Sequence, residues 1–141
     1  MVRPLVMLSI LLLAVGCRLP PDQQPLKPLP EDGLSYSYVE ILARARAQAS
    51  AALEAFYLDA WKELEAAGLG LEQTARFLPR TSDQPLEVKE HLILEAKLLH
   101  KDALRLVQAA QVQDVHGASE TLQKIHLKIR SLRPKEPTKK D

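Results

Sequence analysis

The stretch from residue 35 to residue 133 most constrains the fold, because its apolar residues recur at helical spacing and nowhere alternate as in a strand. It is rich in Ala, Leu, Glu, Lys, Arg and Gln, which have high helix propensity. Apolar residues at every third or fourth position form one face of an amphipathic helix. The stretch therefore predicts an all-α domain.

Capping and breaking signals delimit the first two predicted helices. The first covers about residues 35–56. The second follows Asp59, a residue type that often caps a helix N-terminus, and runs to Leu78, where Pro79 follows. Neither Gly nor Pro separates these two helices, so a single helix reaching Ala67 is an alternative.

A turn at residues 81–85 precedes the third predicted helix, which covers residues 86–110, and a fourth runs from its N-cap Asp114 to Leu132. The residues predicted to face a core lie on one stripe of each helix and include Tyr38, Ile41, Leu42, Ala45, Ala49, Ala52, Leu53, Phe56, Trp61, Leu64, Leu71, Leu86, Leu92, Ile93, Leu99, Leu106, Val115, Leu122, Ile125 and Ile129. Four amphipathic helices with short connections predict an up-down-up-down four-helix bundle.

The chain has one cysteine, Cys17, and the residues before it follow the pattern of a secretory signal peptide. Arg3 precedes an apolar run from Leu5 to Val15, which is too short to span a bilayer and ends in small residues. The segment resembles a bacterial lipobox, with Ala14 where Leu is usual. The resemblance implies cleavage before Cys17 and acylation of its thiol, for example with palmitate. An uncleaved anchor and a secretory signal with a free thiol are the alternatives.

The expected processing divides the chain into four parts. These are a lipoprotein signal peptide at residues 1–16, a lipidated and Pro-rich linker at 17–33, the helical bundle at 34–133 and a disordered tail at 134–141. Proline favours extended backbone, so the linker is expected to act as a tether. Arg18, and not Asp, follows the cysteine. By resemblance to enterobacterial sorting rules, this favours the outer membrane, facing the periplasm.

Charge excludes a large electrostatic binding surface. The chain has 19 Lys plus Arg and 18 Asp plus Glu, and Arg3 lies in the expected signal peptide, so the mature part is balanced. A balanced chain has no single-sign field that would attract nucleic acid or an anionic membrane surface. We therefore expect no nucleic acid partner, and attachment to the lipid membrane through acylated Cys17.

The sequence carries no pattern typical of an enzyme. His91, His100, His116 and His126 lack metal-ligand spacing, and neither a Gly-rich phosphate loop nor a nucleophile elbow occurs. Acylation of Cys17 would leave no thiol for catalysis. We predict no catalytic residues and no metal site.

The predicted last helix resembles a known family. The stretch from Asp114 to Arg130 is similar to the last helix of cytochrome c-prime bundles, where C-x-x-C-H is followed by Arg or Lys. Leu122 and Ile125 stand at the two cysteine positions, and His126 stands at the histidine. Ala and Leu patterns upstream extend the likeness over about residues 35–133.

In that family the cysteines bind haem covalently and the histidine ligates the iron. Leu122 and Ile125 cannot form thioethers, so the resemblance implies a haem-less bundle. We expect this bundle to act through its surface, as a structural, chaperone-like or partner-binding lipoprotein, with an unknown envelope protein as its partner. The alternative is a noncovalent haem or electron-transfer site with His126 as axial ligand, as in b-type bundle cytochromes. The only methionines are Met1 and Met7, both in the expected signal peptide. A packed interior around His126 would favour the first interpretation, and an open apolar pocket the second.

Overall fold

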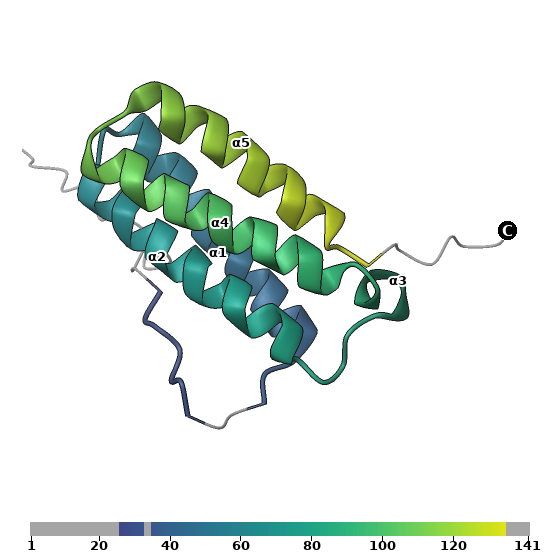
Figure 1. Ribbon diagram of the computed structural model, residues 1–141. Helices are drawn as coiled ribbons and strands as arrows, with labels where there is room; N and C mark the ends of the chain where they lie inside the picture. Colours follow the sequence, from purple (N-terminus) through teal and green to yellow (C-terminus); the bar gives the residue numbers. More distant parts are fainter. Residues whose placement is uncertain (1–25, 33–34, 135–141) are drawn as a thin grey trace, which may run out of the picture.

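The computed structural model describes residues 26–32 and 35–134, and all regular structure in these ranges is helical. The predicted all-α class is thus confirmed. Cys17, the expected signal peptide and all but the first residue of the expected tail lie outside the described residues. Four long helices and two short ones follow one another, namely α1 (Tyr38–Tyr57), α2 (Trp61–Phe77), η2 (Leu78–Arg80), α3 (Leu86–Lys89), α4 (Leu92–Gln111) and α5 (Val115–Ser131) (Figure 1).

The long helices pack around one apolar core. α1 packs against α2, α2 against α4, α4 against α5, and α5 against α1 (Figure 1). Gly68 lets α2 approach α4 closely, since a Cβ there would lie 2.9 Å from Val107 Cγ2. None of the helices within the described ranges is long and apolar enough to cross a membrane. Most of the predicted core is confirmed, and its largest fully buried side chains are Tyr38, Ile41, Leu42, Leu64, Leu71, Leu78, Leu92, Leu99, Leu106, Leu122, Ile125 and Leu132.

The four long helices form two hairpins of matching length. α1 and α4 each have 20 residues, and α2 and α5 each have 17. An offset of 54 residues relates them, because Tyr38 begins α1 where Leu92 begins α4, and Trp61 begins α2 where Val115 begins α5. The hairpins share few identical residues. The repeat therefore lies in helix lengths and geometry.

The turns of the two hairpins also match. Asp59 and Gln113 are counterparts and both have positive φ, at 53° and 54°. In each turn the following N–H, that of Ala60 or Asp114, donates to a carbonyl five residues back at 2.9 Å. The alternative of one helix reaching residue 67 is therefore wrong. The predicted N-cap Asp59 is also wrong, because its left-handed backbone moves the N-cap position to Ala60, whereas the predicted cap Asp114 is confirmed by its bond from Gly117 N–H.

Each hairpin holds a polar pair at the equivalent place, in which Gln48, Thr74 and Asp102 are buried and Lys128 is half-buried. Thr74 Oγ1 donates to Gln48 Oε1 at 2.6 Å between α2 and α1. Lys128 Nζ lies 3.4 Å from Asp102 Oδ2 between α5 and α4. Gln48 and Asp102 are counterparts in the repeat, as are Thr74 and Lys128. The contact between the two helices of a hairpin, which we call the seam, thus contains a neutral pair in the first hairpin and an ion pair in the second.

The third predicted helix is broken, which corrects its predicted extent. α3 ends at Lys89, and α4 begins at Leu92 after an irregular His91 with φ −107° and ψ −5°. The break keeps Val88 in the core but turns Leu86 to solvent, where it is 85% exposed. Ile93 and Val115, also predicted to face the core, are exposed instead.

α1 begins later than the predicted residue 35, at a capping box. The Ser37 side chain accepts from Glu40 N–H, and the Glu40 carboxylate accepts from Ser37 N–H. Tyr38 then enters the core, where its hydroxyl donates to Leu132 O at 2.6 Å, and its N–H donates to Asp83 Oδ1 at 2.7 Å. Burial raises the pKa of Tyr38 to about 12. This residue therefore ties the start of α1 to the end of α5 and to the 81–85 turn.

Candidate functional site

His126 lies on α5 at the edge of a pocket formed with the end of α1. The side chain is half-buried, and its Nε2 is shielded from solvent and has no hydrogen-bond partner. In the hairpin repeat its counterpart is Glu72. The pocket has a volume of about 440 Å³, opens to solvent and is lined by Leu53, Phe56, Tyr57, Ser119, Leu122, Gln123, His126 and Leu127.

Side chains fill the interior beside His126. Leu122 is 2% exposed and Ile125 is fully buried, and both belong to the single core cluster. The pocket therefore lies outside the core, between the end of α1 and α5, and not between the four helices. An interior haem of the cytochrome c-prime kind does not fit this packing, because these two side chains occupy the space that the resemblance assigns to the porphyrin edge.

The residue types that line the surface pocket suit a haem, but the position of the His126 ring does not. A free imidazole nitrogen beside apolar and aromatic side chains is a suitable donor. A metal ion bound to such a nitrogen lies about 2 Å from it. Nε2 of His126 has less than 1 Å² of accessible surface, so the ring must turn before a metal can reach it. Across residues 26–32 and 35–134, no three His, Cys, Asp or Glu side chains are grouped so as to hold a metal ion.

One end of the bundle exposes a set of apolar residues, which we call the apolar end. Both hairpin turns lie at this end (Figure 1). The exposed apolar residues are Tyr57 and Leu58 at the first turn and Val112 and Val115 at the second, and Leu58 and Val112 are counterparts in the hairpin repeat. Tyr57 also lines the pocket and contacts Phe56 edge-to-face, at 5.7 Å between ring centroids. Clustered exposed apolar residues are typical of contact surfaces.

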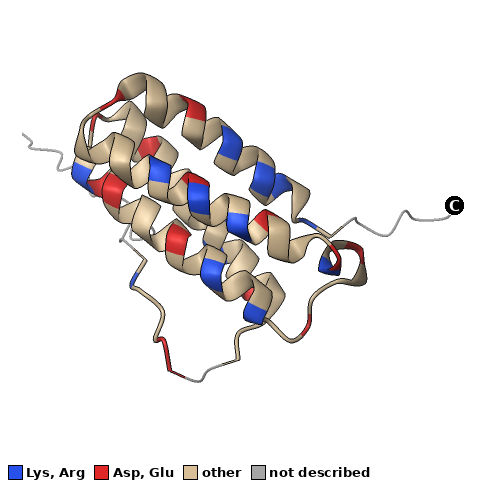
Figure 2. Ribbon diagram, viewed as in Figure 1, with Lys and Arg blue, Asp and Glu red and all other residues tan. Residues whose placement is uncertain are grey.

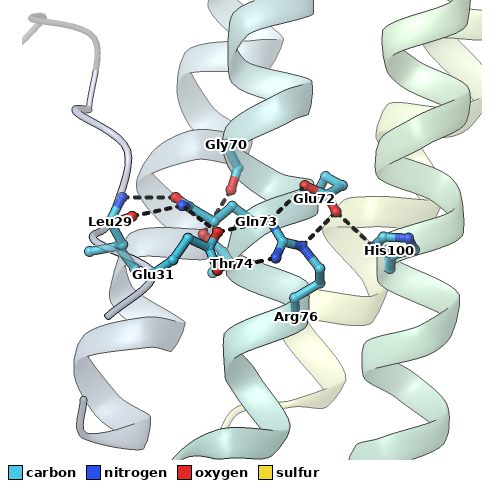
Figure 3. Close-up of polar contacts among 8 residues, drawn as sticks. All are labelled: Leu29, Glu31, Gly70, Glu72, Gln73, Thr74, Arg76 and His100. Carbon is cyan, nitrogen blue, oxygen red and sulfur yellow. Dashed lines mark hydrogen bonds and ion pairs between the residues drawn. The ribbon is translucent and has the colours of Figure 1, made fainter. Parts of the chain in front are cut away.

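A second candidate site lies on the outer face of α2, where the segment of residues 26–32 crosses it. We call this segment the strap. Leu29 N–H donates to Gln73 Oε1 at 2.8 Å, and Gln73 Nε2 donates to Leu29 O at 2.9 Å (Figure 3). Arg44 of α1 donates to Lys27 O. The sequence predicted a tether here, whereas the described part of the segment is held against two helices.

Charged side chains continue this site from the strap to α4. Arg76 of α2 pairs with Glu31 of the strap at 3.1 Å and with Glu72 at 2.7 Å (Figure 3). Glu72 Oε1 also lies 3.3 Å from His100 Nδ1 of α4. Both Arg76 and Glu31 are substantially exposed, so solvent screens the ion pair between them and it contributes little to stability. The network thus orients the strap more than it stabilises the fold.

We predict that acid weakens the docking of the strap, although the backbone bonds of Leu29 and Lys27 remain. Hydrogen bonds from Arg76, and next from Gln73, hold the pKa of Glu31 below its usual value of 4.5. Because the pKa is lowered in the docked state, docking is fully supported above pH 4.5 and loses this support as the pH falls through the lowered pKa. The amide NMR signals of Leu29 and of the Gln73 side chain should shift together in this range. The variant Arg76→Gln removes the main cause of the lowered pKa of Glu31, so the midpoint of this NMR transition should move to higher pH. An unchanged midpoint would contradict the assignment of the transition to Glu31.

Of the two predicted site residues, Cys17 lies outside the described residues and His126 lines the pocket. The four histidines lie apart, with His116 near Glu120 on exposed α5 surface and His100 near Glu72. Sequence reasoning missed the strap site, because Gln73 and Arg76 occupy the polar face of an amphipathic helix and resemble any solvent-facing residues. Basic and acidic residues both occur on each of the four long helices (Figure 2).

Comparisons with known proteins add no family. The chain matches no protein-family model, and neither a curated protein nor a solved structure is significantly similar to it. The case for function therefore depends on the sequence patterns and on the geometry described above.

Proposed function

We propose that this chain is a membrane-anchored, non-enzymatic lipoprotein of the bacterial cell envelope whose helical bundle acts by binding another envelope protein. The lipobox-like segment before Cys17 supports the anchor. The observation that carries the binding role is the apolar end, where Tyr57, Leu58, Val112 and Val115 are all more than half exposed beside an open pocket. Exposed apolar patches of this kind stabilise protein contacts when they are covered.

The proposed bundle is an up-down-up-down arrangement that resembles cytochrome c-prime without its haem. The packing of each long helix against two neighbours, and the short turns of the two hairpins, support this arrangement. Burial of Leu122 and Ile125 at the two cysteine positions supports the loss of covalent haem. In this proposal the apolar side chains replace the cofactor as the centre of the core.

The second candidate function is a noncovalent haem or electron-transfer bundle. The observation that favours it is the unpartnered Nε2 of His126 next to a pocket with two aromatic residues, Phe56 and Tyr57. A haem there would use His126 as its axial ligand and would supply one-electron chemistry. The chain itself would contribute the ligand and an apolar wall.

Two measurements in cells test the anchor and the binding role. A clickable fatty acid should label the protein, and Cys17→Ala should abolish the label. A photo-crosslinking amino acid at Leu58 or Val112 should give one discrete adduct. The same probe at Leu86, a still more exposed leucine at the other end of the bundle, should give none (Figure 1). Absence of label, or adducts from Leu86 alone, would contradict the proposal.

Haem titration decides between the two functions. We expect the purified full chain to give no Soret band that depends on His126 when haem is added. A stable Soret band that His126→Ala abolishes would establish the second candidate instead. His100→Ala is the matched control, because His100 is also a half-buried helix histidine but lies away from the pocket.

A further inference from the structure

The strap is recognised through its backbone. The Gln73 carboxamide accepts from Leu29 N–H at 2.8 Å and donates to Leu29 O at 2.9 Å, so one side chain satisfies both polar groups of one residue. Arg44 adds a bond to the carbonyl of Lys27, two residues earlier. Bonds of this kind require an extended backbone and do not depend on which side chains it carries.

Side chains of the strap add selectivity. Leu29 packs against the core cluster, while Pro28 and Pro30 on either side are exposed. Proline fixes φ near −65°, which keeps the segment extended before it binds and lowers the entropy lost on binding. Glu31 then meets Arg76 at 3.1 Å. The site therefore selects a segment of the form Pro-Leu-Pro-Glu.

The hydrogen bonds of the Gln73 carboxamide go to the strap and not to other helices. Both ends of its carboxamide bond to the strap, to Leu29 and to Glu31, and the side chain is 9% exposed. Its counterpart in the second hairpin, Leu127, is apolar and 66% exposed. The seam of the first hairpin is closed separately, by Thr74 and Gln48. The strap can therefore leave without opening the helix pair.

We propose that Gln73 and Arg76 on this face of α2, together with Arg44 of α1, form a binding site for an extended Pro-Leu-Pro-Glu segment of an envelope protein partner. The strap occupies the site as an intramolecular competitor. The exposed ion pairs are weak, and only Leu29 is partly buried, so the competitor is displaceable. The envelope location of the partner rests on the proposed function, whereas the site itself needs neither the lipid nor the apolar end.

A peptide titration tests the site. A fluorescent peptide with the sequence of residues 25–32 is titrated into the full chain purified in detergent, and into the double variant Leu29→Pro, Glu31→Lys. This variant lacks the N–H that bonds to Gln73, the apolar contact of Leu29 and the Glu31 carboxylate, so the strap is disabled. A flexibly linked competitor acts at an effective concentration of about 1 mM, so a peptide with a Kd of about 0.1 mM should bind the strap-disabled variant about tenfold more tightly. Equal, or no, saturable binding to the two proteins would overturn the proposal.

Two further variants make the test specific. In the strap-disabled background, Gln73→Ala should abolish peptide binding, and Leu127→Ala, its counterpart on α5, should leave binding unchanged. Circular dichroism confirms that each variant remains helical, and binding that survives Gln73→Ala in a folded protein would overturn the proposal. Sedimentation of the unaltered chain tests the occupant. If the unaltered chain dimerises and Gln73→Ala abolishes the dimer, the occupant of the site is a second copy of this chain, and the proposed envelope partner is overturned.

Discussion

Replacing Ile125 with alanine is expected to lower the free energy of unfolding by about 2–5 kcal/mol. Ile125 is fully buried in the single core cluster, so the truncation removes apolar contacts and leaves a cavity. Leu122→Ala should have an effect of the same size, since Leu122 is 2% exposed. Urea denaturation followed by circular dichroism measures both changes.

The matched control for Ile125→Ala lies two residues away on the same helix. Leu127 is 66% exposed, so Leu127→Ala should change the free energy of unfolding by no more than about 0.5 kcal/mol. Equal effects at the two positions would contradict the packing. A small effect at Ile125 would mean that the interior next to His126 is not filled by side chains, and would reopen the case for an interior cofactor.

Lys128→Met is expected to cost about 3 kcal/mol of stability, the lower end of the range for breaking a buried pair. The Asp102 side chain is only 7% exposed, and its carboxylate lies 3.4 Å from Lys128 Nζ. Arg105, at 3.6 Å, still faces the remaining charge, which keeps the loss from being larger. Lys124→Met is the control, because Lys124 is an exposed lysine on the same helix.

The double variant Asp102→Leu, Lys128→Met should recover most of that stability. Removing both charges leaves no unpaired carboxylate, and exchanging a buried ion pair for apolar side chains is often neutral or favourable. The neutral pair of Gln48 and Thr74 at the equivalent place in the first hairpin shows that the seam does not need charge. A double variant less stable than Lys128→Met alone would contradict this account.

Local sequence signals predicted those parts of the fold that local physics determines. The apolar stripes of α1, α4 and α5 fixed the helical class and most of the core, and Asp114 was found because capping chemistry acts within one turn. The single long third helix failed, because the break at His91 depends on how Val88 and Leu92 meet the rest of the core. The predicted cap at Asp59 was wrong because aspartate is common both at helix N-caps and at turn positions with positive φ, and the sequence does not distinguish the two.

The candidate sites were predictable only in part. The half-buried state of His126 follows from its place beside the apolar stripe of α5. The pocket does not, because it needs the end of α1 to pack beside α5. The strap site joins Leu29 to Gln73 across 44 residues, and no periodicity or motif marks such a contact. The hairpin repeat was hidden for a related reason, since matching lengths and turns do not require matching residues.

Native mass spectrometry of the protein purified from its own membrane tests the central claim most directly. The account predicts a chain that begins at Cys17, carries acyl groups on that residue and has no haem bound. A chain cleaved elsewhere or lacking acyl groups would contradict the anchor, and a bound haem that is lost in His126→Ala would contradict the haem-less bundle.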